Sequence, residues 1–131
     1  MRTHKLSTTS IARMQGIDLR LVDIAHRGLE LSPIDFGIPE YGGLRTIEQQ
    51  EKLFADGKSK ADGVKKLSYH QSGKALDFYA YVDGKASWNK PHMFMVATAL
   101  LQAANELGHR LEWGGLWVSW QDYPHVQLVD D

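Results

Sequence analysis

The stretch Ser68–Asp77 contains two side chains that can bind a metal ion. His70 and Asp77 are seven positions apart, on either side of a change from a polar, glycine-containing turn to an apolar run. Near the C-terminus, Asp122 lies three residues before His125. A catalytic zinc ion usually takes three protein ligands and keeps a fourth position for water. Two histidines and one aspartate can supply those ligands, and one carboxylate is left over.

These residue types together predict a zinc hydrolase. We expect His70, Asp77 and His125 to bind the metal, which lowers the pKa of its water. Asp122 would then accept a proton from that water as attack begins. An extended backbone at Tyr123-Pro124 would place the Asp122 carboxylate beside the metal without binding it.

Amide cleavage also requires a group that stabilises the oxyanion of the tetrahedral intermediate, and a fixed positive charge serves well. Arg45, just before a predicted helix, is the candidate, although it could instead pair with Glu48 or Glu112. Glu112 precedes Trp113-Gly114-Gly115, where the glycines would let the backbone approach a ligand closely. Simpler interpretations stay open for the other candidates: a surface or core role for each of the six histidines, a plain turn at 122–125, and core or rim positions for Trp113, Trp117 and Trp120.

Composition is that of one soluble globular domain. The chain has 131 residues, 43% hydrophobic and 24% charged, long enough for a single core. The net charge of −1 gives no general attraction to nucleic acid or anionic membranes. Cysteine is absent, so a metal must be bound by His, Asp or Glu. No apolar signal-peptide core follows Met1, and no run is long enough to insert in a membrane, so we expect synthesis in the cytoplasm.

Local signals predict helices and strands in blocks. Asp18 is a suitable helix N-cap, Thr46 with Gln49 matches a capping box, and Asp83-Gly84 is a hairpin turn. We expect helices over 7–15, 18–31, 46–57 and 91–107, and strands over 35–40, 75–81, 111–113 and 125–128. Without regular βαβ alternation, these elements predict an α+β fold with a small antiparallel sheet flanked by helices. The lysines in 58–66 (Lys58, Lys60, Lys65, Lys66) predict a solvated surface loop, with contact to an anionic substrate as the alternative.

At these residues the sequence resembles the zinc D-alanyl-D-alanine carboxypeptidase (VanY-like) superfamily of peptidoglycan peptidases. The shared pattern is Ser-x-His, then Gly-x-Ala-x-Asp, and later a carboxylate three residues before a histidine. Ser68–Asp77 matches every fixed position, and Asp122-Tyr-Pro-His125 matches the second half. Gly43-Leu-Arg-Thr46 is similar to the arginine motif, and Glu112-Trp-Gly-Gly115 with Trp117 to the stretch before the last ligand. The similarity extends from about residue 29 to residue 128.

Within the superfamily, the chain is most similar to phage L-alanyl-D-glutamate endopeptidases, endolysins that cut the stem peptide of peptidoglycan. The resemblance implies a hedgehog/DD-peptidase-like fold, one Zn²⁺ on His70, Asp77 and His125, Asp122 as base and Arg45 as electrostatic stabiliser. It gives Ser68 an outer hydroxyl contact near the site, and Gly73 a turn that lets His70 and Asp77 face one ion. The further residues around the site or substrate are Glu112, Trp113 and Trp117.

The resemblance leaves part of the function open. Many relatives have Glu where this chain has Asp122, so a D,D-carboxypeptidase or dipeptidase that releases terminal D-Ala is an alternative. A non-catalytic wall-binding module is an alternative of another class. We expect residues 1–131 to form one catalytic domain, with 1–16 as an extension of unassigned role. We also expect a monomer that reaches the cell wall after a separate holin-type protein permeabilises the membrane.

Overall fold

The computed structural model describes residues 4–129 and contains helices and short antiparallel strands. The α-helices are α1 (Thr8–Arg13), α2 (Leu19–Leu31), α3 (Ile47–Ala55) and α4 (Lys90–Leu107), and the 3₁₀ helices are η1 (Tyr69–Ser72) and η2 (Gly114–Leu116). The strands are β1 (Asp35–Gly37), β2 (Ala75–Asp77), β3 (Tyr79–Val82), β4 (Lys85–Ser87), β5 (Leu111–Trp113) and β6 (His125–Leu128). The predicted α+β class is confirmed.

The helix boundaries follow the local signals. Asp18 caps α2 by accepting a hydrogen bond from the backbone N–H of Arg20. Thr46 and Gln49 form both hydrogen bonds of the predicted capping box at α3. The predicted hairpin is also present, because Asp83 and Gly84 both have positive φ between β3 and β4.

The strands form two three-stranded antiparallel sheets, in the orders β1-β3-β4 and β2-β6-β5. The prediction of one strand over 75–81 is therefore wrong, since the chain passes from one sheet to the other at Phe78. Asp77 pairs with His125 of β6, whereas Tyr79 pairs with Gly37 of β1. Phe78 itself is fully buried. The apolar run over 75–81 is continuous, so it gave no sign that its two halves pair with different strands. Those strands, β6 and β1, are distant in the sequence. The strand predicted over 35–40 is likewise shorter and ends at Gly37.

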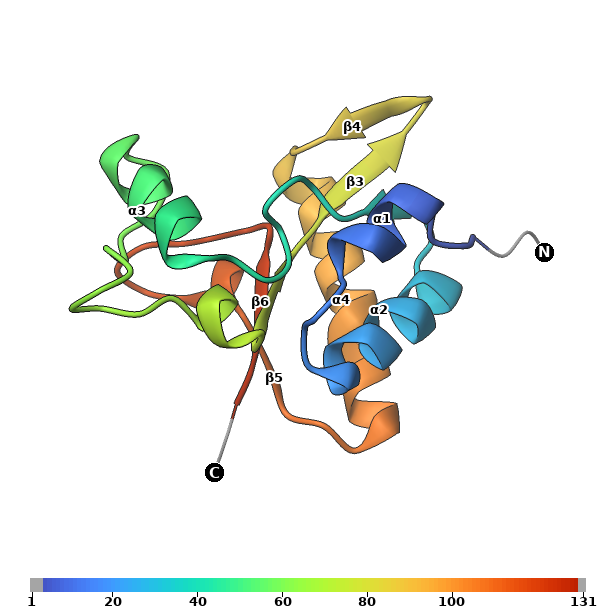
Figure 1. Cartoon of the computed structure of the whole chain (residues 1–131). Coiled ribbons are helices and arrows are strands. Elements are labelled where there is room, and N and C mark those ends of the chain that lie inside the picture. The colour runs from blue at the N-terminus through green and yellow to red at the C-terminus, as the bar shows by residue number, and fades with distance from the viewer. Residues whose placement is uncertain (1–3, 130–131) are drawn as a thin grey trace.

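The hydrophobic core lies between α4, α2 and the two sheets. Figure 1 shows α2 alongside α4, with α3 on the opposite side of β6. The two helices approach closely at Gly28, where a Cβ would lie 2.8 Å from the Leu100 side chain. Of the described residues, none belongs to a helix long and apolar enough to span a membrane.

The first helix packs against the loop that follows β1. Ser10 Oγ accepts a hydrogen bond from Ile38 N at 3.0 Å, and Arg13 Nη1 donates to Ile38 O at 3.0 Å. The backbone of Arg13 also lies so close to Gly43 that a Cβ there would be 2.1 Å from the Arg13 carbonyl oxygen. Helix α1 therefore supports the loop that carries Gly43, a residue that contacts the candidate metal site.

Candidate metal centre

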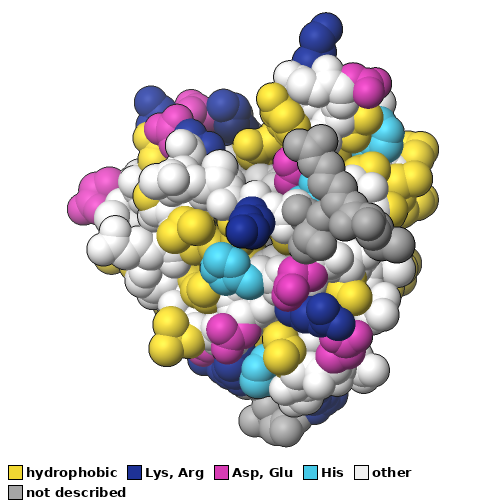
Figure 2. All heavy atoms as spheres, turned by 90° about the vertical axis from the view of Figure 1, so that its right-hand side faces the viewer, with side chains coloured by type: hydrophobic (Ala, Val, Ile, Leu, Met, Phe, Trp, Pro, Cys, Tyr) yellow, Lys and Arg dark blue, Asp and Glu magenta, His cyan; other side chains and the backbone are white. Residues whose placement is uncertain are grey.

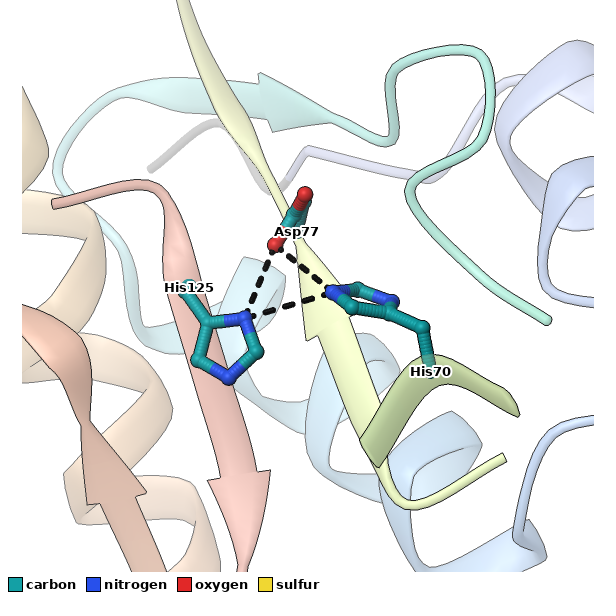
Figure 3. Close-up of side chains that lie close together, drawn as sticks. All are labelled: His70, Asp77 and His125. Atoms are coloured by element: carbon teal, nitrogen blue, oxygen red, sulfur yellow. Dashed lines mark hydrogen bonds and ion pairs between the residues drawn. The ribbon is translucent and has the colours of Figure 1, made fainter. Parts of the chain in front are cut away.

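Three side chains point toward one another where η1, β2 and β6 meet (Figure 3). His70 Nε2 lies 3.1 Å from Asp77 Oδ1 and 3.2 Å from His125 Nδ1. The distance from His125 Nδ1 to Asp77 Oδ1 is 3.2 Å. The structure thus brings together the three predicted ligands, and among the described residues they form the one His/Cys/Asp/Glu group able to bind a metal ion.

Strand register places two of these ligands side by side. Asp77 on β2 is directly opposite His125 on antiparallel β6, and opposite residues of such a pair project from the same face. Side chains alternate along β6, so Val126 and Leu128 enter the core while His125 and Gln127 face the site. His70 reaches the same point from η1, which ends at Gly73 in the left-handed conformation, with φ 73°.

The outer hydrogen bonds of the two histidines fix which ring nitrogens carry protons. His70 Nδ1 lies 2.9 Å from the carbonyl oxygen of Gly43, and His125 Nε2 lies 2.7 Å from Gln127 Oε1. Both oxygens can only accept, so both of these nitrogens donate. In neutral rings, His70 Nε2 and His125 Nδ1 consequently present lone pairs to each other and to Asp77. Three electron-rich atoms at this spacing require a cation or a proton between them.

Arg45 contacts the outer oxygen of Asp77. Its Nη2 donates to Asp77 Oδ2 at 3.0 Å, Nη1 donates to Gln50 Oε1 at 3.0 Å, and Nε donates to Tyr41 O at 2.8 Å. Arg45 therefore pairs with Asp77 and with neither Glu48 nor Glu112. Burial opposes ionisation of Asp77, but the histidines outweigh it and hold the pKa of that carboxyl far below its usual range. Asp77 is thus a carboxylate ready to bind a cation.

Asp122 lies beside the three candidate ligands without joining them. Its Oδ2 is 3.9 Å from His125 Nδ1. Burial, together with the charge of Asp77, raises its pKa, although His125 and Arg45 act in the opposite direction. For His125, burial lowers the pKa, but Asp77 outweighs this effect and the net pKa is raised. Asp122 is thus the carboxyl group of the site whose pKa is raised above its usual value.

The backbone at Tyr123-Pro124 is a turn, so the predicted extended geometry is wrong. His125 N donates to Asp122 O at 3.2 Å across this turn. Asp122 N also donates to Gly114 O at 2.9 Å, and a Cβ on Gly114 would lie 2.4 Å from Asp122 O. Gly114 therefore permits close approach of the Asp122 backbone, whereas the sequence predicted that this glycine lets the chain approach a bound ligand.

Some of the other predicted site residues line a cleft beside the candidate ligands, whereas Trp113 lies in the hydrophobic core. A cleft of about 480 Å³ is lined by Arg45, Ser68, Trp117 and Asp122 together with the three candidate ligands. The Ser68 hydroxyl accepts from His70 N at 3.2 Å and so caps η1. The Trp117 indole N–H donates to the Glu112 carboxylate, and its ring lies 5.3 Å from that of His125. Glu112 does not line the cleft itself, but its hydrogen bond orients the Trp117 ring that does.

Trp113 is a core residue and does not line the cleft, so the structure places it at the core position that the sequence left open beside a position near the site or substrate. It is opposite Val126 on the apolar face of its sheet and is 7% exposed. Its indole N–H donates to Tyr123 O at 2.7 Å. Trp113 therefore supports the turn after Asp122 from the core side.

Two glutamines that contact the site were not predicted from the sequence. Gln127 accepts from His125, and buried Gln50 accepts from Arg45. Gln127 is two positions after His125 on a predicted strand, so alternation could have identified it as a neighbour on the same face. Gln50 gave no such signal, because its contact with Arg45 depends on how α3 packs.

The fold and the site together define a small α+β protein with a candidate metal centre of the hydrolase type. A family model described as phage L-alanyl-D-glutamate peptidase matches residues 2–130, and the chain belongs to this family.

Individual relatives agree with this membership. The chain is 38% identical to the L-alanyl-D-glutamate peptidase of Escherichia phage T5, covering 95% of this chain and 98% of the relative. It is 30% identical to the peptidoglycan L-alanyl-D-glutamate endopeptidase CwlK of Bacillus subtilis, covering 73% of this chain and 62% of CwlK. The crystal structure of the L-Ala D-Glu endopeptidase ChiX of Serratia marcescens superposes with a TM-score of 0.85 at 30% identity, covering 98% of this chain and 92% of ChiX.

Proposed function

We propose that this chain is a zinc-dependent peptidoglycan hydrolase that cleaves the L-alanyl-D-glutamate bond of the stem peptide. The observation that carries the proposal is the convergence of three lone-pair atoms, from His70, Asp77 and His125, in a member of a peptidase family. The substrate follows from the names of the relatives, each an L-alanyl-D-glutamate peptidase.

The donor set fits zinc. Zinc–nitrogen and zinc–oxygen bonds of roughly 2.0–2.1 Å in a tetrahedron separate neighbouring ligand atoms by about 3.3 Å. The three distances here are 3.1, 3.2 and 3.2 Å. Outer hydrogen bonds from both imidazoles to oxygen acceptors are typical of histidine ligands. Zinc bound there would act as a Lewis acid on the substrate carbonyl and would make water a better nucleophile.

Asp122 is assigned to proton transfer. Its carboxylate lies at the edge of the ligand group and opens into the cleft, where it can accept a proton from the attacking water. The same carboxyl group can then return the proton to the leaving amine of D-glutamate. The shorter aspartate side chain is sufficient here because the turn at 122–125 brings its backbone close to His125.

Arg45 is assigned to two roles. Three of its five N–H groups donate to Tyr41, Gln50 and Asp77, which fixes the guanidinium and one candidate ligand. The other two N–H groups are assigned to the carbonyl oxygen of L-Ala, where negative charge develops during attack. Burial lowers the pKa of Arg45, although Asp77 and Asp122 oppose that shift, and a guanidinium remains charged under these conditions.

The biological setting follows from the resemblance to phage endolysins. We propose that residues 1–131 act as one catalytic domain and as a monomer. The enzyme would reach the wall through a membrane permeabilised by a separate holin-type protein.

Digestion of purified peptidoglycan, followed by mass spectrometry of the products, tests the proposal. We expect fragments with a new L-Ala carboxyl terminus and a new D-Glu amino terminus, abolished by a chelator and restored by zinc. Release of terminal D-Ala alone would favour the carboxypeptidase alternative. Binding to the wall without any cleavage by the zinc-loaded protein would favour the non-catalytic module.

A further inference from the structure

Three lysines line the same cleft as the candidate metal ligands. Lys58, Lys60 and Lys66 come from the loop between α3 and η1, and all three side chains are exposed. The proposed hydrolysis step uses none of them. The sequence left two interpretations of this loop, a solvated surface and a contact for an anionic substrate.

The loop is bound firmly to the site. Gln50, which is fully buried, donates from Nε2 to Ser59 Oγ at 2.8 Å and to Ala61 O at 2.8 Å. Its Oε1 accepts from Arg45, which in turn contacts Asp77. A continuous chain of hydrogen bonds therefore connects the candidate metal ligand with the Ser59 hydroxyl and the Ala61 carbonyl, on either side of Lys60.

The second half of the loop is also anchored. Gln71, next to His70, donates to Gly63 O at 2.9 Å. Asp62 accepts from the backbone N–H groups of residues 64, 65 and 66, and Gly63 N donates to Lys66 O at 3.1 Å. The loop is therefore anchored through Gln50 and Gln71, both of which adjoin residues of the site, and this fixes where its lysines are presented.

Positive charge is concentrated in this cleft. Its lining includes four cationic side chains, those of Arg45 and the three lysines, against two carboxylates, those of Asp77 and Asp122. The whole chain, by contrast, has a net charge of −1. The face on the α1 side, shown in Figure 2, carries acidic and basic side chains interspersed. Bound zinc would make the cleft more positive still, and such a cleft attracts anions.

Lys60 extends across the cleft toward the segment between η2 and β6. Its Nζ lies 5.3 Å from the ring centroid of Trp120, a cation–π distance. Trp120 belongs to the segment that leads to Asp122 and lines the same cleft. The ammonium group is thereby directed over the cleft between the lysine loop and the tryptophan segment.

We propose that Lys58, Lys60 and Lys66 bind the free carboxylate of the D-glutamate residue that follows the scissile bond. This inference rests on the proposed function. Glutamate has two carboxyl groups, and only one can continue the peptide, so the other remains a carboxylate unless it is amidated. The lysines would therefore make the enzyme selective for D-glutamate over its carboxamide analogue, at positions set by the anchored loop.

Two synthetic peptides test the selectivity. Both contain an L-alanyl bond to the D residue, with a free carboxylate in one and a carboxamide in the other. For the zinc-loaded wild type, we expect kcat/KM to be about tenfold higher for the carboxylate peptide, mainly through KM, with the preference decreasing as salt rises.

The triple variant K58Q/K60Q/K66Q should reduce the preference to about twofold or less, because each lysine contributes a partly screened charge. Its zinc content should match the wild type, which excludes loss of the metal site as the cause. Lys85→Gln is the control, since Lys85 is an exposed lysine on β4 that does not line the cleft. It should preserve the full preference.

Equal hydrolysis of both peptides by the wild type, or an unchanged preference in the triple variant, would overturn the lysine assignment. Calorimetric binding to the zinc-loaded Asp122→Ala variant separates this inference from the proposed function. Tighter binding of the carboxylate peptide, lost when the three lysines are also replaced, supports the inference. Failure of the wild type to cleave either peptide would refute the proposed function but would leave this binding result intact. Equal binding of both peptides would refute the inference.

Discussion

The two candidate histidine ligands use different ring nitrogens, and each ring is fixed by one oxygen acceptor on its outer side. His70 relies on a backbone carbonyl, that of Gly43, which cannot be removed by deleting a side chain. His125 relies on the side chain of Gln127, which mutation can remove. This difference makes the outer contact of His125 the more informative one to test.

Replacing Gln127 with Ala should lower zinc affinity by about 10–100-fold, because the His125 ring loses the acceptor that fixes its tautomer and orientation. Competition with a chromophoric chelator measures the affinity. Gln102→Ala, at an exposed position on α4, should leave it unchanged. Wild-type affinity in Gln127→Ala would show that this hydrogen bond does not tune the site.

Asp122→Ala should retain zinc and lose activity by about 10²–10⁴-fold, since it removes the proposed proton acceptor but no metal ligand. His70→Ala should lose both zinc and activity. Metal analysis and peptidoglycan digestion on the same preparations distinguish the two effects. Full lytic activity in Asp122→Ala would rule out its assignment as the base.

At the scale of elements, the turn between η1 and β2 sets the relation between His70 and Asp77. Gly73 has φ 73°, and a Cβ there would lie 3.2 Å from Ile17 Cα and 3.3 Å from Gly16 O. Gly57 has a similar φ of 74° but has no atom within 4 Å of a Cβ. Substitutions at Gly57 and Gly73 therefore distinguish the cost of left-handed backbone strain from the cost of steric crowding at Cβ.

Gly57→Ala should cost about 1–2 kcal/mol of unfolding free energy, from the left-handed backbone alone. Gly73→Ala should cost more, because the Cβ also meets the backbone of the α1–α2 linker, and it should weaken zinc binding as well. Denaturant unfolding and zinc titration measure the two effects. Equal destabilisation by the two variants, with unchanged zinc binding, would contradict this account.

The same linker is fastened by Asp18, which caps α2 and accepts from Arg20 Nη2 at 2.8 Å and from Lys74 Nζ at 3.1 Å. Hydrogen bonding from Arg20, followed by that from Lys74, holds the pKa of Asp18 well below its usual value despite opposing burial. Lys74 is adjacent to Gly73, so this cluster connects α2 with the stretch that carries the candidate ligands.

Asp18→Ala should destabilise the protein by about 1 kcal/mol or more, through loss of the cap and the ion pairs. Asp18→Asn keeps a capping side chain and should lose only the ion pairs, about 1 kcal/mol or less. Because the folded pKa is lowered, the ionic contribution is complete above the unfolded value of about 3.9 and is lost gradually as pH falls from there through the much lower folded pKa. Urea unfolding should show that the difference between wild type and Asp18→Asn is largest at pH 7 and starts to shrink below about pH 4. A difference independent of pH would contradict this explanation.

For the whole molecule, the candidate ligands connect segments far apart in the sequence. His70 and His125 are 55 residues apart and come from different elements. A metal that binds all three ligands binds the folded chain in preference to the unfolded one, so it should stabilise the entire fold.

At a free zinc concentration of roughly 100 times Kd, bound zinc should raise the free energy of unfolding by about 3 kcal/mol relative to the zinc-free protein. Removing zinc should lower it by the same amount. For a chain of this length, that corresponds to a decrease in Tm of about 10 °C. Thermal unfolding with and without a chelator measures it. Asp122→Ala should show the same decrease and His70→Ala none, whereas a chelator-insensitive wild type would contradict a structural contribution from zinc.

Features that depend on neighbouring residues could be predicted from the amino-acid sequence. The cap at Asp18, the capping box at Thr46 and the Asp83-Gly84 turn are interactions within a few positions, so local patterns predict them. The residue types also suggested a metal group, although surface or core roles for the histidines and a plain turn at 122–125 stayed open. Family resemblance added the pairing of the two distant motifs.

Features that depend on contacts between distant segments could not be predicted from the sequence and became evident in the folded chain. The register that sets Asp77 opposite His125, the change of sheet at Phe78 and the core position of Trp113 follow from partners that the chain acquires on folding. The contact of Arg45 with both Asp77 and Gln50 has the same origin, as does the anchoring of the lysine loop through Gln50. Alternation along a strand predicts two faces, but packing of the whole chain determines which face becomes core and which becomes the cleft.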